Sequence, residues 1–166
     1  MIEKPIFCRP APLGAIATGN ERAEAPAVHL GLYGSPGLIW RTNGSSNAWA
    51  RGQMPASTAI SMASVVAANA QAGTTIRLRL GTSQAHVDGG SAPYDSGAVT
   101  FVSPAEAVDD ARYHSFQQFS AVNATWWRID MGGHTGDFEA MGLILGTAVQ
   151  TTRFYDRGWE LSPIDL

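Results

Sequence analysis

The chain has 166 residues, of which 45% are hydrophobic and 15% are charged, and its net charge is −3. This composition is too apolar and too close to neutral for a disordered chain, and no run of about 18 apolar residues predicts membrane insertion. The eleven basic residues are dispersed and Cys8 is the single cysteine, so we expect no nucleic-acid partner, no internal disulfide and no cysteine-rich zinc site.

Residues 1–36 are expected to form an extended N-terminal arm. Five of the nine prolines fall in this range, and proline fixes φ and removes a backbone donor, which disfavours a regular helix or a central strand. The range also carries too many apolar side chains for a solvated linker, among them Ile6, Phe7 and Leu30. Two interpretations stay open: the arm lies on the surface of its own domain, or it packs on a neighbouring subunit.

Residues 37–166 predict one β-sandwich domain. Residues 74–80 alternate, with Ile76 and Leu78 on one face and Arg77 on the other, which predicts a strand with one wet face. Residues 125–131 alternate in the same way and place the ring of Trp127 in the core. Other expected strands are 37–41, 98–102, 116–122, 138–145, 149–155 and 159–161, whereas 59–69 fits either a strand or a short helix.

The remaining segments are expected to be turns and loops. Asn43-Gly44 is a strong turn signal, residues 81–97 are rich in glycine and read as a loop, and residues 103–112 predict one helical turn. About eight short strands with turn signals between them, and no long helix, are typical of an all-β fold, a β-sandwich or jelly roll.

Motifs of the common enzyme classes are absent from the sequence. The only lysine is Lys4, which excludes a Walker A loop, and neither a G-x-S-x-G elbow nor an H-E-x-x-H helix occurs. We therefore expect no enzymatic activity, no catalytic residues, no cofactor and no metal site.

Four polar residues are candidates for contact with a ligand or partner. His86 and Asp88 lie on the same side of the chain if their segment is extended, and His134 and Asp137 stand among glycines in a loop. The alternative interpretation is that all four are polar loop residues beside glycine turns.

Two aromatic residues complete the set of candidates. Trp126 shares a strand face with Arg128 and Asp130, which leaves its ring to be covered by the arm or by a partner. Tyr94 lies in the glycine-rich loop. Exposed Trp and Tyr rings offer flat platforms for sugar rings or protein partners, although in a β-sandwich most such rings belong to the core.

Several segments share their order and pattern with a known family. They are Thr74-Thr-Ile-Arg-Leu-Arg-Leu-Gly, Tyr94-Asp-Ser-Gly, Trp126-Trp-Arg-Ile-Asp, Phe138-Glu-Ala-Met-Gly-Leu-Ile-Leu-Gly, and the closing Gln150-Thr-Thr-Arg-Phe-Tyr-Asp-Arg-Gly-Trp-Glu. Over about residues 37–161 the chain resembles tailed-bacteriophage virion proteins with a galactose-binding-like (discoidin-type) jelly roll. It departs from the discoidin-like pattern after Trp49, where Ala-Arg-Gly-Gln replaces an apolar–Asp–apolar strand.

The resemblance implies a structural component of a phage tail tip or baseplate that acts by subunit assembly and contributes to host-surface attachment. Its expected partners are other virion tail proteins, further copies of itself as a homo-oligomer, and a host glycan. The expected location is the virion, assembled in the host cytoplasm, since no signal-peptide pattern opens the sequence. The alternative function is a carbohydrate-binding module that recognises a host cell-surface glycan.

Overall fold

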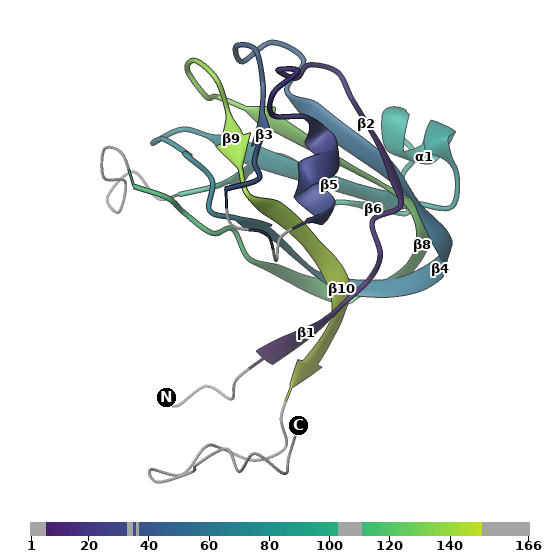
Figure 1. Ribbon diagram of the computed structural model, residues 1–166. Coiled ribbons are helices and arrows are strands. Elements are labelled where there is room, and N and C mark those ends of the chain that lie inside the picture. Colours follow the sequence, from purple (N-terminus) through teal and green to yellow (C-terminus); the bar gives the residue numbers. More distant parts are fainter. Residues whose placement is uncertain (1–5, 33–34, 36, 103–110, 151–166) are drawn as a thin grey trace, which may run out of the picture.

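Two long antiparallel strands, β4 (Trp49–Val66) and β8 (Gln117–Gly132), form the centre of the fold (Figure 1). The computed structural model describes residues 6–32, 35, 37–102 and 111–150. The strand order of the main sheet is β1-β10-β4-β8-β5-β6, while β2 pairs with β4 and β7 with β5. Their bounds are β1 Ile6–Pro10, β2 Ala15–Thr18, β5 Thr75–Gly81, β6 Tyr94–Asp95, β7 Val99–Thr100 and β10 Gly142–Gln150. A separate two-stranded sheet joins β3 (Trp40–Arg41) to β9 (Glu139–Ala140).

A bulge divides β4 into two parts. The pairing register with β8 shifts between Gln53 and Thr58, around Pro55, which has no backbone N–H to donate to the ladder. The part before the bulge pairs with β2 and β8, and the part after it pairs with β8 and β10. The bend lets one long strand pair with β2 at one end and with β10 at the other.

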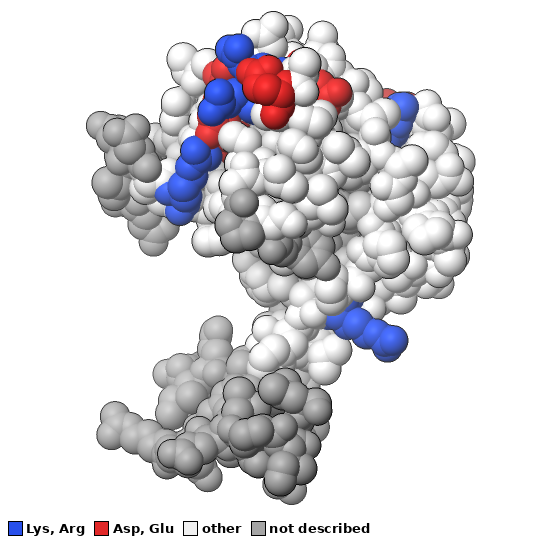
Figure 2. Space-filling view, viewed as in Figure 1, with Lys and Arg blue, Asp and Glu red and all other residues white. Residues whose placement is uncertain are grey.

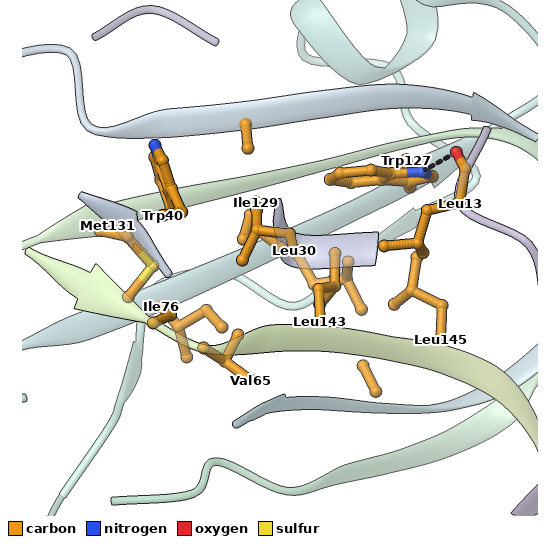
Figure 3. Packing of buried hydrophobic residues seen from close by; sticks show 14 of the residues in the cluster. Leu13, Leu30, Trp40, Val65, Ile76, Trp127, Ile129, Met131, Leu143 and Leu145 are labelled. Carbon is orange, nitrogen blue, oxygen red and sulfur yellow. Dashed lines mark hydrogen bonds between the residues drawn. The ribbon is translucent and has the colours of Figure 1, made fainter. Parts of the chain in front are cut away.

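The buried apolar side chains of these strands form one hydrophobic core (Figure 3). Trp127 and Ile129 are fully buried, which confirms the face assignment that their alternation predicts. The indole Nε1 of Trp127 donates a hydrogen bond of 3.0 Å to the carbonyl oxygen of Leu13, so its one polar atom is satisfied. Leu143 and Leu145 of β10 are also fully buried.

The segment expected to be an extended arm lies on the sandwich itself. Strand β1 pairs with β10 at one edge of the sheet, β2 pairs with the first part of β4, and a 3-10 helix, η1 (Ala27–Gly31), follows. Leu13 and Leu30 of this segment are buried in the core. Of the two interpretations left open, the described residues show contact with the arm's own domain.

Several expectations about individual elements change. The strand expected at 138–145 is divided between β9 and β10, and the one expected from residue 149 begins within β10. Residues 59–69 are strand as far as Val66, and residues 116–122 and 125–131 form one strand, β8. Residues 81–97 are not wholly loop, because they contain α1 (Gln84–Asp88) and β6. The side chain of Ser83 accepts a hydrogen bond from the backbone N–H of His86 and caps α1. The helical turn at 103–112 falls largely outside the described residues, as do the strands after residue 150.

Neither helix in the described ranges is long and apolar enough to cross a membrane.

Candidate functional site

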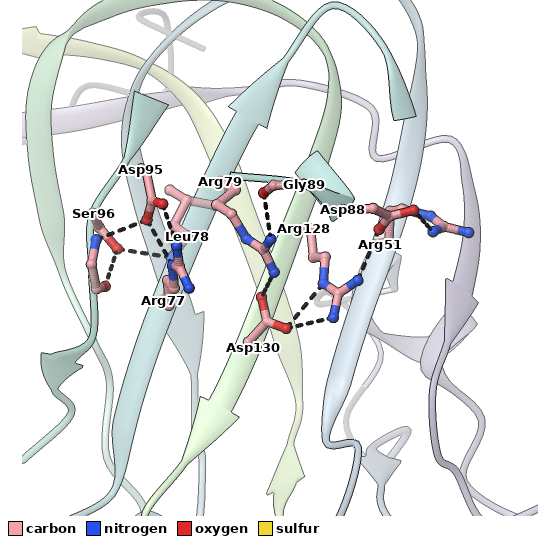
Figure 4. A network of polar contacts seen from close by, with 11 residues as sticks. Arg51, Arg77, Leu78, Arg79, Asp88, Gly89, Asp95, Ser96, Arg128 and Asp130 are labelled. Atoms are coloured by element: carbon pink, nitrogen blue, oxygen red, sulfur yellow. Dashed lines mark hydrogen bonds and ion pairs between the residues drawn. The ribbon is translucent and has the colours of Figure 1, made fainter. Parts of the chain in front are cut away.

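The outer face of β4, β8 and β5 carries a row of arginine side chains (Figure 4). Because side chains alternate along a strand, the pattern that buries Trp127 turns Trp126 and Arg128 outward. The strand register places Arg51 directly opposite Arg128, and Arg128 directly opposite Arg79. Like charges opposite one another destabilise a sheet, so this row requires negative charges between its members.

Two carboxylates supply those charges. Asp88, at the end of α1, pairs with Arg51 through one oxygen and accepts a hydrogen bond of 2.8 Å from Nη1 of Arg128 through the other. Asp130 accepts from Nε and Nη2 of Arg128 at 3.0 and 2.7 Å, and from Nη2 of Arg79 at 2.5 Å. Each carboxylate therefore bridges two neighbouring guanidinium groups.

The far end of the row is ion-paired. Arg77 forms a two-point ion pair with Asp95, with distances of 2.8 and 2.5 Å. The side chain of Arg79 is only 7% exposed, and its Nη1 donates to the carbonyl oxygen of Gly89, which fixes the end of α1 to β5. These contacts fix the β5 end of the row, where Arg77 is 41% exposed, whereas the side chain of Arg51 at the β4 end is 17% exposed.

The charges of this network are stabilised in their ionised forms. Partial burial raises the pKa of Asp88, but hydrogen bonds from Arg128 and Gln84 and the charge of Arg51 outweigh burial, so the net pKa lies below the ordinary value. Partial burial lowers the pKa of Arg128, and its bonds to Asp130 and Asp88 raise it above the ordinary value. Both groups are charged at neutral pH.

Two half-buried tryptophans border the arginines. The guanidinium carbon of Arg128 lies 4.4 Å from the ring centroid of Trp49, and that of Arg51 lies 5.3 Å from Trp49 and 6.0 Å from Trp126. These distances fall within the range of cation–π contacts. We call Trp49, Arg51, Asp88, Trp126 and Arg128 the Trp–Arg face.

The structure brings three of the expected contact residues together here: His86, Asp88 and Trp126. The helix α1 packs against β5 at Gly81, where an added Cβ would lie 2.6 Å from Cβ of His86. Gly81 pairs in register with Trp126. The segment is helical and not extended, so His86 and Asp88 do not share a side, and only Asp88 reaches the arginines.

His134 and Asp137 lie in the loop after β8 and stabilise that loop. His134 is buried, its Nδ1 lies 3.1 Å from Oγ1 of Thr74, and its Nε2 lies 3.1 Å from the carbonyl oxygen of Asp137. The carboxylate of Asp137 accepts hydrogen bonds from the backbone N–H of Gly44 and from Arg22, which hold its pKa below the ordinary value. Neither residue belongs to the Trp–Arg face.

Tyr94 lies in β6, opposite the core residue Leu80 in register. Its ring stacks on that of Phe119, with centroids 4.0 Å apart, and packs against the core. Partial burial, followed by the charge of Asp95, raises the pKa of its hydroxyl group. The Tyr94 ring therefore faces away from the arginine row.

A second group of charges, the loop-end cluster, gathers at the end of the sandwich opposite β1 (Figure 2). It consists of the ion-paired residues Arg22, Arg41, Arg112, Asp137 and Glu139. Trp40 and Phe138, the aromatic residues beside it in sequence, are fully buried. The cluster offers paired charges and no ring from these two residues, so the Trp–Arg face is the stronger candidate for a binding site.

No group of three or more His, Cys, Asp or Glu side chains in the described part of the chain is placed to hold a metal ion.

Sequence reasoning did not select Trp49, Arg51 or Arg128 as contact residues. The sequence does contain an alternating pattern here, in which the large side chains of Trp49 and Arg51 are separated by the small residues Ala50 and Gly52. In the structure Ala50 and Gly52 are the buried residues of this pattern. The stretch from Ala50 to Gln53, where the chain departs from the discoidin-like pattern, is the part of β4 that carries Arg51.

No protein-family model matches the sequence, and no curated protein matches it. Chitosan-binding module 1 derived from the chitosanase/glucanase from Paenibacillus sp. IK-5 covers 82% of this chain and 97% of its own, with a TM-score of 0.57 and 12% identity. The CBM32 of AlyQ, in complex with 4,5-unsaturated mannuronic acid, covers 82% and 96%, with a TM-score of 0.57 and 15% identity. CBM32-3 from a family 31 glycoside hydrolase from Clostridium perfringens covers 81% and 90%, with a TM-score of 0.59 and 12% identity.

These likenesses confirm the predicted fold, a galactose-binding-like jelly roll. The three neighbours are carbohydrate-binding modules, and none of them is a virion protein. They therefore give no support to the expected role as a component of a phage tail. At such low identity the likeness concerns the fold, and the ligand must be argued from this chain's own residues.

Proposed function

We propose that this chain is a non-catalytic carbohydrate-binding module and that the Trp–Arg face is its glycan site. The observation that carries the proposal is the pair of half-buried indoles, Trp49 and Trp126, on either side of the Arg51 guanidinium. An indole face packs on the C–H groups of a sugar ring, and guanidinium and carboxylate groups hydrogen-bond its hydroxyls.

The structural neighbours support this proposal over the virion interpretation, which implies the same fold. Structural neighbours on the same jelly roll have names that specify sugar ligands, including a fucose-binding module of Streptococcus pneumoniae. The rigid support beneath the Trp–Arg face also suits a binding site, because Asp88 and Asp130 hold Arg128 in one orientation before a ligand arrives.

The test is a glycan array followed by titration calorimetry of the best glycan against wild-type protein and the variant Trp126→Ala. Loss of a stacking indole is expected to weaken binding by about 10-fold or more. The matched control is Phe116→Ala, which removes an aromatic ring that is 54% exposed outside the Trp–Arg face. A blank array at high protein concentration, or equal losses in the two variants, would contradict the proposal.

One observation favours a second candidate function, self-association of the chain as a homo-oligomer, which the virion resemblance implies. Phe7 of β1 and Val149 of β10 pair in register at the edge of the sheet, and they are 48% and 49% exposed. A second copy of the chain that packed on this pair would bury both side chains.

This second candidate is tested by the mass of the protein in solution. Light scattering during gel filtration is expected to show an oligomer for wild-type protein and a monomer for Phe7→Glu. The exposed Val28, which lies outside this edge, provides the control Val28→Glu. A monomeric wild-type protein at high concentration would exclude assembly through these strands alone.

A further inference from the structure

The arginine row carries more positive than negative charge. Four guanidinium groups, those of Arg51, Arg77, Arg79 and Arg128, are balanced by only the three carboxylates of Asp88, Asp95 and Asp130. The whole chain, by contrast, has a net charge of −3. The positive excess is therefore a local property of this face.

Within the Trp–Arg face, the arginine with the most unused hydrogen-bonding capacity is Arg51. Arg128 directs three N–H groups at Asp88 and Asp130, and Arg79 is nearly buried. Within the described part of the chain, the guanidinium of Arg51 makes one ion pair, through Nη1 to Asp88. A guanidinium has five donors in a fixed fork that matches a carboxylate in two-point geometry.

The guanidinium of Arg51, whose side chain is 17% exposed, lies beside the two half-buried rings that would stack on a sugar. Arg51 and Gln53 follow Trp49 on the outer face of β4, and the register pairs Gln53 with Trp126 on β8. The Trp49 ring already carries the guanidinium of Arg128 at 4.4 Å, so a sugar ring on the Trp126 indole, 6.0 Å from the guanidinium carbon of Arg51, would place a substituent near Arg51. A neutral hydroxyl at that position would accept one hydrogen bond, whereas a carboxylate would also compensate the unbalanced charge.

We propose that the Trp–Arg face takes an acidic sugar, a uronate residue of an oligosaccharide, whose carboxylate binds the guanidinium of Arg51. This inference rests on the proposed function and narrows it to one ligand class. A charge-assisted two-point contact of this kind is expected to favour the acidic sugar over its neutral counterpart by roughly 10- to 100-fold.

The test uses matched pairs of ligands that differ only at the carboxyl group. Oligogalacturonate and oligomannuronate are titrated into the protein beside the same oligomers after reduction of the carboxylates to primary alcohols. The expected result is the preference stated above, and it is expected to weaken as salt is raised, since the contact is partly exposed.

Variants then locate the contact. Arg51→Gln is expected to abolish the preference and Arg51→Lys to retain part of it, while thermal melts verify that both variants fold. The exposed Arg9 of β1 provides the control Arg9→Gln, which removes one positive charge elsewhere and is expected to keep the full preference.

The outcomes separate this inference from the proposed function. Equal affinity for acidic and reduced oligomers, binding of neutral glycans alone on the array, or an acidic preference that survives Arg51→Gln would each overturn the uronate assignment and leave a glycan-binding module. No binding to any acidic or neutral glycan would overturn both.

Discussion

Gly52 lies directly opposite Trp127 across the β4–β8 ladder, and the indole fills the space that a side chain on Gly52 would need. A Cβ on Gly52 would lie 2.5 Å from Cζ2 of Trp127, closer than such atoms approach. The indole cannot move away freely, since its Nε1 is bound to the carbonyl oxygen of Leu13. We expect Gly52→Ala to lower the free energy of unfolding by about 1–3 kcal/mol through overpacking.

Chemical denaturation measures this loss, and Gly90 provides a control. A Cβ on Gly90 would meet nothing within 4 Å, so Gly90→Ala is expected to change the stability by less than about 0.5 kcal/mol. If the two variants were equally stable, the close approach of Gly52 to Trp127 would be wrong.

The contribution of the N-terminal segment to the core is tested by two leucines in or next to η1. Leu30 is fully buried and Leu32 is 46% exposed. Leu30→Ala is expected to cost about 2–5 kcal/mol because it leaves a cavity in the shared core, whereas Leu32→Ala is expected to be nearly neutral. Thermal and urea unfolding of both variants measures the two losses in the free energy of unfolding. Equally small losses would show that the segment only rests on the surface of the sandwich and does not contribute to its core.

Much of this fold follows from local sequence patterns. Strict alternation over 74–80 and 125–131 predicted two central strands and placed Trp127 in the core. The continuity of β4 was not predictable, because Pro55 in its middle is a signal against a central strand and is tolerated here only at the bulge. The helix α1 escaped detection since its five residues span little more than one turn, and its capping by Ser83 is a local contact with no periodic signal.

The candidate site was predictable in parts but not as a whole. Trp126 and Asp88 each stood out in the sequence, the first by its face and the second by its place near His86. Their proximity depends on the register of three strands and on Gly81, which lets α1 approach β5 closely. No spacing within a single segment encodes such an arrangement.

The ion pair between Arg77 and Asp95 predicts a pH dependence of stability. The hydrogen bond from Arg77, with smaller help from the backbone N–H of Gly97, lowers the pKa of Asp95 to about 2 despite some burial. The ordinary pKa of an aspartate side chain is about 3.9. The ion pair therefore stabilises the folded state above about pH 4, and this stabilisation is lost as the pH falls toward 2. The side chains are 41% and 28% exposed, so the expected contribution is only about 0.2–1 kcal/mol.

Two measurements test this pair. The stability difference between wild-type protein and Asp95→Asn is expected to be constant near neutral pH and to shrink between pH 4 and 2. Carboxyl NMR is expected to show that Arg77→Gln moves the titration midpoint of Asp95 upward. A wild-type midpoint near 4 would contradict the proposed effect of Arg77.

Asp88 separates two guanidinium groups that face each other across neighbouring strands, Arg51 and Arg128. Asp88→Asn keeps the shape of the side chain but removes the charge, so we expect a loss of about 1–3 kcal/mol in the free energy of unfolding. The side chains of Arg51 and Arg128 are 17% and 15% exposed, so salt screens their repulsion only in part, and the loss is expected to be modestly smaller in 1 M NaCl than at low salt. The double variant Asp88→Asn/Arg51→Gln removes one of the two repelling groups and is expected to be more stable than Asp88→Asn alone. A double-mutant cycle with no coupling between positions 51 and 88 would show that Asp88 does not compensate the charge of Arg51.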